Sequence, residues 1–165
     1  PDWANKQMQT WYGEDWSAGW EFGETLFDAR QNKPQLGQDL SAVGLSPKIA
    51  DIVRATAVTL SADYQGPLTQ VVLPKMLADK SAMVRRAALQ TVDALSAELR
   101  WELAGKLLND PVLAVRIEAA RVLALIPAAG LNPAQKQLLD KVLQEYIRAQ
   151  NTNAELPQSH INLGL

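Results

Sequence analysis

Three short segments of the chain repeat at one fixed spacing: Val53-Arg54-Ala55-Thr56-Ala57-Val58, Val84-Arg85-Arg86-Ala87-Ala88-Leu89 and Val115-Arg116-Ile117-Glu118-Ala119-Ala120, each 31 residues after the one before. A fixed period in this range is typical of solenoid proteins, in which each unit buries its apolar face only against its neighbours. The repeat therefore predicts the architecture before any single helix is considered.

Helix start and stop signals place these segments in helical hairpins. Two full hairpins are predicted, with helices at about 67–79, 81–95, 97–109 and 111–126. A weaker first copy has helices at 34–43 and 47–62, and a long helix is expected from Asn132 to about Asn151. In the helix predicted at 81–95, the residues expected to face the core are Met83, Val84, Ala87, Ala88, Val92 and Leu95. No segment alternates as a strand does, so the predicted fold is all-α, a right-handed α-α superhelix of stacked hairpins.

Changes in composition divide the chain into three segments. Residues 1–33 hold four of the five tryptophans and both phenylalanines, with six acidic against three basic residues. Residues 34–130 are rich in Ala, Leu and Val and contain the repeats. Residues 131–165 carry the long helical pattern, which Glu155-Leu156-Pro157 interrupts before a final helical turn. We expect an aromatic-rich helical cap, a repeat region and a long C-terminal helix, in that order.

The composition is that of a folded domain and argues against several functions. Of the 165 residues, 47% are hydrophobic, which is enough to bury one continuous core. No run of about eighteen uncharged apolar residues occurs, so no membrane insertion is expected. The net charge of −2, with no basic stripe, argues against nucleic acid as a partner. Because the chain has no cysteine, it contains no disulfide, thiolate metal site or covalent haem attachment.

At the level of single residues, the repeats resemble HEAT repeats of the short bacterial kind. Asp79 precedes Arg85 by six positions, and Asp110 precedes Arg116 by the same spacing. In HEAT repeats an Asp in the turn and an Arg in the second helix take this spacing, and stacked units form an Asp–Arg ladder. The carboxylate accepts hydrogen bonds from unpaired N–H groups at a helix N-terminus, while the guanidinium bridges to the adjoining turn.

The first copy departs from this pattern. Arg54 has Lys48 where the Asp belongs, which puts the ladder contact of Arg54 in doubt. The small residues Ala57, Ala88 and Ala119 occupy the same position in all three copies, where two helices are expected to approach closely. A large side chain there would overpack the core.

The two ends of the chain resemble multihaem c-type cytochromes that also carry HEAT and tetratricopeptide repeats. Residues Trp3 to Gly13 and Asp28 to Gln31 are similar to the segment that follows a haem-binding Cys-x-x-Cys-His in those proteins. The helix from Leu139 to Gln150 is similar to the one that follows their HEAT units. Residues Pro157 to Gly164 match the opening of a tetratricopeptide repeat, with Leu163-Gly164 at its Leu-Gly pair.

This resemblance implies a fragment that lies between a haem domain and a tetratricopeptide array, in a periplasmic or secreted protein. Haem c is implied for the full-length protein only. Haem binding does not transfer to this chain, because the Cys-x-x-Cys-His motif is absent from it. We therefore expect no cofactor in this chain.

Three conspicuous groups of residues each have two interpretations. The tryptophans Trp3, Trp11, Trp16 and Trp20 pack against a partner or, as favoured, form the core of a terminal cap. His160 is a haem or metal ligand or, as favoured, an ordinary surface residue. The third group is acidic and consists of Glu14, Asp15, Glu21, Glu24 and Asp28. These residues are catalytic carboxylates or, as favoured, part of a solvated surface.

No Gly-rich phosphate loop, Gly-x-Ser-x-Gly elbow or metal-binding His pair occurs in the sequence, so no catalytic, cofactor-binding or metal-binding residue is predicted. In HEAT stacks the second helix of each hairpin lines the concave side. The outward positions of those helices form a predicted interaction face, which also fits an ordinary solvated surface. Besides Ala55, this interaction face comprises Thr59, Arg86, Gln90, Asp93, Ile117, Glu118 and Arg121.

The predicted function is that of a non-catalytic scaffold. Such a module would hold a haem domain and a tetratricopeptide array in fixed relation, or dock an electron-transfer partner. Its partners would be other proteins or neighbouring domains of the same chain. The alternative is a HEAT-like module of the phycobilin-lyase-related type, which would bind a chromophore.

Overall fold

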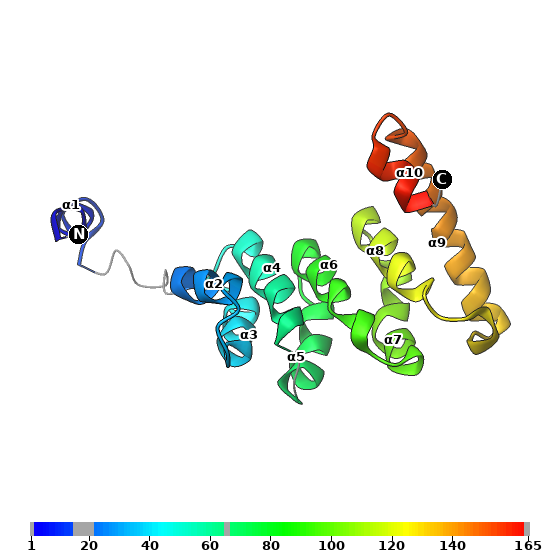
Figure 1. Ribbon diagram of the computed structural model, residues 1–165, viewed down its shortest axis with the longest axis horizontal. Coiled ribbons are helices and arrows are strands. Elements are labelled where there is room, and N and C mark those ends of the chain that lie inside the picture. The colour runs from blue at the N-terminus through cyan, green and yellow to red at the C-terminus, as the bar shows by residue number, and fades with distance from the viewer. Residues whose placement is uncertain (1, 15–21, 65–66, 164–165) are drawn as a thin grey trace.

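The computed structural model describes residues 2–14, 22–64 and 67–163, and these residues are arranged in helices, turns and loops without a strand (Figure 1). The prediction of an all-α fold is therefore confirmed for this part of the chain. Several residues discussed above lie outside the described residues, namely Asp15, Trp16, Trp20, Glu21 and Gly164.

The helices follow one another in a simple order. Helices α1 and α2 span Asp2–Tyr12 and Phe22–Arg30. Three hairpins follow, made of α3 and α4 (Gly37–Leu45 and Asp51–Leu60), α5 and α6 (Pro67–Leu77 and Ala82–Gln90), and α7 and α8 (Ala97–Ala104 and Leu113–Leu123). Helices α9 (Pro133–Thr152) and α10 (Pro157–Leu163) complete the chain. Short 3-10 segments cover Ser61–Asp63, Val92–Ala94, Gly105–Asn109 and Ala128–Gly130.

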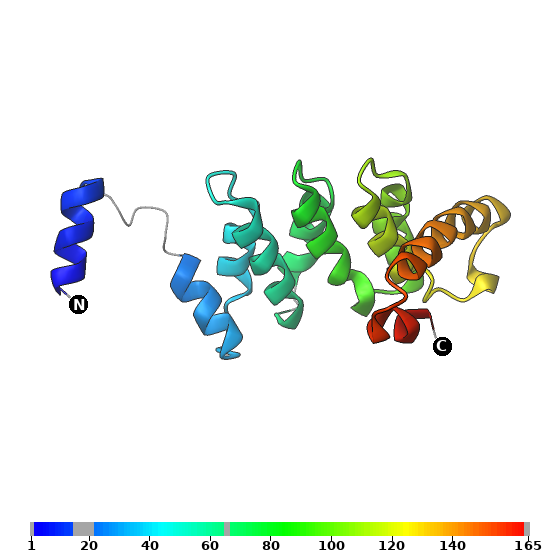
Figure 2. The ribbon, with the colours of Figure 1, turned by 90° about the horizontal axis from the view of Figure 1, so that it is seen from above.

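The three hairpins pack side by side in two rows of helices. Helices α4, α6 and α8 form one row, and α3, α5 and α7 form the other (Figures 1 and 2). Helix α2 packs on α3 and α4 at one end, α9 packs on α8 at the other, and α10 folds back on α9. The second helices of the hairpins thus share one side of the molecule.

Local hydrogen bonds explain where the helices begin. The side chain of Asn132 accepts the N–H of Gln135, and the side chain of Gln135 accepts the N–H of Asn132, so α9 starts with a capping box followed by Pro133. The helix predicted at 111–126 starts only at Leu113, because the carboxylate of Asp110 accepts the N–H of Val112 and holds a turn there.

Two clusters of buried side chains form the core. The larger runs from α4 to α9, and the smaller joins α2, α3 and α4 through Leu26, Ala29, Leu40, Val43 and Ala57. Ala57, Ala88 and Ala119 are all fully buried, as expected for positions of close helix approach. Each hairpin therefore buries its apolar face against the next.

The prediction that the tryptophans form the core of a terminal cap is wrong for those that the structure describes. Trp3 is 73% exposed and Trp11 is 65% exposed, and α1 contributes no residue to either cluster. The end of the stack is covered instead by α2, whose Leu26 and Ala29 are buried. Leu26 and Ala29 fit against α3 and α4 at this end with Phe22 packed beside them, whereas Trp3 and Trp11 stay outside.

The prediction for Met83 also fails, because this side chain is 48% exposed at the start of α6. The other five residues assigned to the core side are buried or, for Leu95, half-buried.

The described residues include no helix with the combined length and apolarity that crossing a bilayer requires.

Replacing Ala119 by Phe is expected to lower the free energy of unfolding by about 1 to 3 kcal/mol, because the added ring has no space between α8 and its neighbours. Chemical denaturation monitored by circular dichroism measures this difference. Ala114→Phe is the matched control, since Ala114 is exposed on the same helix. Equal losses in both variants would contradict the assigned packing.

Candidate functional site

The predicted ladder aspartates, Asp79 and Asp110, lie in the turns inside the second and third hairpins, and Arg85 and Arg116 lie on the helices that follow those turns. The guanidinium of Arg85 donates to both carboxylate oxygens of Asp110, from Nε at 2.7 Å and from Nη2 at 2.8 Å. Its Nη1 donates to the backbone carbonyls of Asp79 at 2.9 Å and Lys80 at 3.0 Å. One arginine therefore ties its own turn to the turn of the next hairpin.

The aspartates hold the turns as well as the arginines. Asp79 accepts the N–H of Ser81 at 2.8 Å, and Asp110 accepts the N–H of Val112 at 2.9 Å. Each carboxylate therefore satisfies a backbone donor at the start of a second helix, in addition to a guanidinium from the preceding hairpin.

The doubt about Arg54 is corrected by the structure. Arg54 is buried, pairs with Asp79 and donates from Nε to the carbonyl of Gly44 at 3.1 Å. Its carboxylate partner comes 25 residues after it, in the next hairpin, so the identity of Lys48 does not matter to Arg54. An arginine that pairs with position 48 would stand at Gly23 in the 31-residue register, and no such arginine exists.

The ladder ends on α9 with a different residue. In the 31-residue register the partner of Arg116 would be Lys141, which has the wrong charge. Arg116 instead donates from Nε to Glu145 at 2.8 Å, one helical turn further along α9, and from Nη1 to the carbonyl of Asp110 at 2.9 Å. Glu145 was not among the predicted ladder residues, although an acidic residue one turn beyond the expected position was a usable signal.

The charges of the ladder shift the acidity of its aspartates. Burial by itself raises the pKa of Asp110, but hydrogen bonds from Arg85 and the Val112 N–H, with the charges of Arg85 and Arg116, outweigh it. The same balance operates at Asp79, where burial opposes the hydrogen bonds from Arg54 and the Ser81 N–H. Both carboxyl groups therefore have a pKa below the usual value for aspartate.

The structure divides the predicted interaction face into two groups. Asp93, Glu118 and Arg121 form a charge network with Arg86, in which Arg121 donates to Glu118 at 2.7 Å and to Asp93 at 3.1 Å. Arg86 lies 3.6 Å from Glu118. Thr59, Arg86 and Gln90 line a groove, which is described next.

Part of the predicted face is not free for a partner. Glu118 is only 7% exposed, because Arg121 and Arg86 cover its carboxylate from two helices. Ala55 is buried, and Ile117 is half-buried. The mixed charges of this region therefore serve largely to join α6 and α8.

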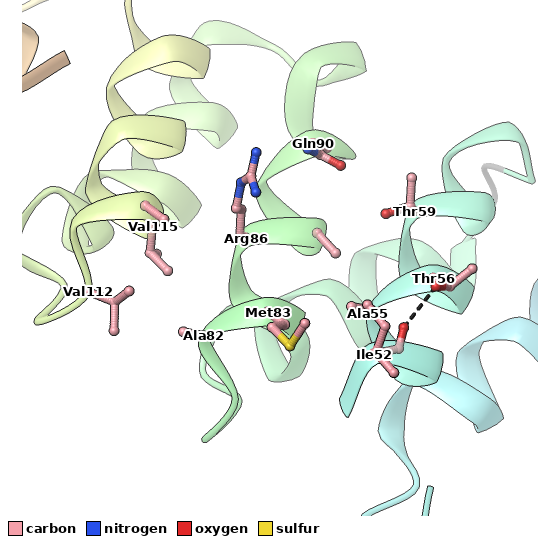
Figure 3. Close-up of a pocket in the computed structure, with 12 residues that line it drawn as sticks. Ile52, Ala55, Thr56, Thr59, Ala82, Met83, Arg86, Gln90, Val112 and Val115 are labelled. Carbon is pink, nitrogen blue, oxygen red and sulfur yellow. Dashed lines mark hydrogen bonds between the residues drawn. The ribbon is translucent and has the colours of Figure 1, made fainter. Parts of the chain in front are cut away.

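The groove runs across α4, α6 and α8 and has a volume of about 360 Å³ (Figure 3). Ile52 and Ala55 line it on α4, Ala82 and Met83 lie in the middle on α6, and Val112 and Val115 lie on the α8 side. Among the described residues that line the groove, Arg86 is the charged one. The groove is thus mainly apolar, with a cation on its central helix.

The exposed apolar residues of the groove were missed by the sequence analysis. Ile52, Met83 and Val112 are all exposed. Ile52 and Met83 stand 31 residues apart, in the same register as the repeats, so their position was open to prediction. Ile52 at the start of α4 and Met83 at the start of α6 are apolar, as core residues are, so nothing in the sequence indicated that they are exposed.

The remaining candidate residues fit ordinary surface roles. His160 is exposed, and its Nε2 lies 2.8 Å from the carbonyl of Ala154. Asp28 pairs with Lys33 at 2.7 Å. Among the residues that the structure describes, no group of three or more His, Cys, Asp or Glu side chains is placed to hold a metal ion.

Comparison of the chain with family models, with curated proteins and with solved structures found no match. The resemblance to HEAT repeats and to multihaem c-type cytochromes therefore stays a prediction from the motifs.

Replacing Asp110 by Ala is expected to lower the free energy of unfolding by about 3 kcal/mol, because it leaves the nearly buried guanidinium of Arg85 without its carboxylate. Denaturant unfolding at neutral pH measures the loss. Asp140→Ala on the exposed side of α9 is the control and should change stability by less than about 0.5 kcal/mol. A loss no larger than that of the control would contradict the role of the ladder.

The ladder also predicts a pH dependence. Because the pKa values of Asp79 and Asp110 are lower in the folded than in the unfolded chain, their contribution to stability is present above the unfolded pKa and is lost as the pH falls below about 4. The double variant Asp79→Asn and Asp110→Asn should lose less stability than the parent between pH 7 and pH 3. Equal losses on acidification would rule out this linkage.

Proposed function

We propose that the chain is a protein-interaction module that binds a partner along the groove of α4, α6 and α8. The observation that carries the proposal is the exposure of Ile52 and Met83 beside Arg86 in one groove. Exposed apolar side chains gathered around a charged group are typical of surfaces that bind a protein segment. Binding, rather than catalysis, is the activity proposed for the chain.

We propose further that the stacked hairpins form a HEAT-like solenoid with a right-handed superhelical course. The repetition of one contact supports this assignment. Arg54 pairs with Asp79, and Arg85 pairs with Asp110, in each case 25 residues along the chain. The same bond between successive turns is the Asp–Arg ladder that HEAT stacks use.

The wider context proposed for the module is a larger multihaem c-type cytochrome of the periplasm or the secreted fraction. There the module would join a haem domain to a tetratricopeptide array or dock an electron-transfer partner, and haem would belong to the other domain. The end of α9 at Thr152 and the start of α10 at Pro157 agree with a new repeat that opens at that proline.

The double variant Met83→Asp and Arg86→Glu should lose its partner, because it places two negative charges in the groove. A tagged chain is incubated with an extract of the source organism, and the retained proteins are compared by mass spectrometry. Val71→Asp is the control, since Val71 is equally apolar and exposed on α5, in the other row of helices. The same proteins retained by all three forms would contradict the proposed surface.

The proposed context predicts the gene sequence upstream of the codon for Pro1. A Cys-x-x-Cys-His motif is expected there, because the resemblance of Trp3 to Gly13 is to the segment that follows such a motif. Sequencing the full gene checks this prediction. An ordinary start codon directly before Pro1 would remove the support for a cytochrome, while leaving the groove proposal intact.

A further inference from the structure

The groove of α4, α6 and α8 has an apolar end and a polar end. Ile52, Met83 and Val112 lie at the starts of the three helices, and their side chains are exposed. Thr59 and Gln90 lie toward the other end, about two turns further along α4 and α6 (Figure 3). The groove therefore offers an apolar surface to one part of an occupant and hydrogen-bonding groups to another.

Arg86 lies between these two ends and has hydrogen-bond donors to spare. Its Nε is 3.6 Å from the carboxylate of Glu118, which is too long for a hydrogen bond. Within the described part of the chain Arg86 donates no hydrogen bond, and its side chain is 54% exposed. The N–H groups of a guanidinium match the two oxygens of a carboxylate, so Arg86 is free to bind one.

The neighbouring charges leave Arg86 as the charge that an occupant meets. Glu118 is nearly buried and accepts a hydrogen bond from Arg121 at 2.7 Å, and Arg121 also donates to Asp93 at 3.1 Å. Of these four charged residues, Arg86 is the one that lines the groove. An exposed cation in an apolar groove is complementary to an anionic group on an otherwise apolar partner.

The size of the groove suits a short segment of a partner. Clefts that bury a small ligand have volumes of about 300 to 1,000 Å³, and this groove has about 360 Å³. Met83 and Arg86 are three residues apart on one helix, so their Cβ atoms are about 5 to 6 Å apart. An apolar and an acidic side chain within about four positions of each other in a partner span the same distance.

We propose that the groove binds a short protein segment in which an apolar side chain and a carboxylate stand within about four residues of each other. The apolar side chain packs against Ile52 and Met83, and the carboxylate accepts hydrogen bonds from Arg86. The inference rests on the proposed function, because it names the chemistry of the segment that the same groove would bind. A segment with lysine in place of the acidic residue is rejected, because like charges repel.

Selection of peptides from a displayed library tests the proposal. Random peptides are selected on the tagged complete chain, and the affinities of the selected sequences are measured as synthetic peptides by fluorescence anisotropy. They should share an Asp or Glu within about four positions of an apolar residue, and should bind Met83→Asp at least about tenfold more weakly than the parent. Val71→Asp, which changes an exposed apolar residue of α5, is the control and should bind them as the parent does.

Paired substitutions identify the contact between the carboxylate and Arg86. Replacing the acidic residue of a selected peptide by its amide should weaken binding to the parent at least about tenfold, and should have little effect on binding to Arg86→Gln, which has already lost the contact. Arg86→Glu should bind best the peptide in which Lys replaces the acidic residue. Lys75→Gln removes an exposed positive charge from α5 and should respond as the parent does.

The outcomes separate this inference from the proposed function. Peptides that depend on Met83 but share no acidic residue, or whose neutralisation weakens binding equally to the parent and to Arg86→Gln, overturn the carboxylate contact and leave the groove as a binding surface. Selected peptides that all bind Met83→Asp as tightly as the parent overturn the groove itself. A selection that yields no binding peptide also overturns the groove.

Discussion

The guanidinium of Arg85 connects two successive turns, because it bonds the carbonyls of Asp79 and Lys80 on one side and the carboxylate of Asp110 on the other. Apolar contact between alanine-rich helices is not directional and would allow hairpins to slide past one another. The hydrogen bonds between successive turns form only when neighbouring hairpins have one fixed position relative to each other. Buried ion pairs are weak evidence for stability alone, and their value here is in fixing the register of the stack. The shared side of α4, α6 and α8 depends on that register.

The sequence was sufficient to predict the hairpin helices, the buried alanines and four residues of the ladder, because these recur from one hairpin to the next. It did not reveal which turn supplies the partner of each arginine, since that depends on how hairpins stack. Arg54 shows the difference: its neighbour at position 48 was the wrong place to look, and Asp79 of the next hairpin was the right one. Glu145 was missed for a related reason, because α9 is a single long helix and does not follow the repeat.

Exposure was the property that the sequence predicted least well. Trp3, Trp11 and Met83 are apolar residues in helical patterns, and such patterns identify a face without saying what covers it. Charge had the opposite outcome. Glu118 was assigned to an open surface, and it is buried between two arginines of adjacent helices. Between α6 and α8 opposite charges pair across the gap, and the apolar side chain of Met83 beside them stays exposed.

The two ends of the stack treat the ladder differently. At the first hairpin no arginine stands 25 residues before Lys48, so no ion pair is needed there and the ladder starts at Arg54. At the last hairpin Arg116 is buried enough to need a carboxylate, and α9 provides one from a residue outside the register. Helix α9 therefore closes the polar series while its Leu139 and Val142 close the apolar one. The first end is covered by Leu26 and Ala29 of α2, with Phe22 packed beside them, while Trp3 and Trp11 of α1 stay exposed. Each end of the stack is therefore covered by a helix that does not belong to the repeat, and at the α9 end that helix also supplies the carboxylate of Glu145.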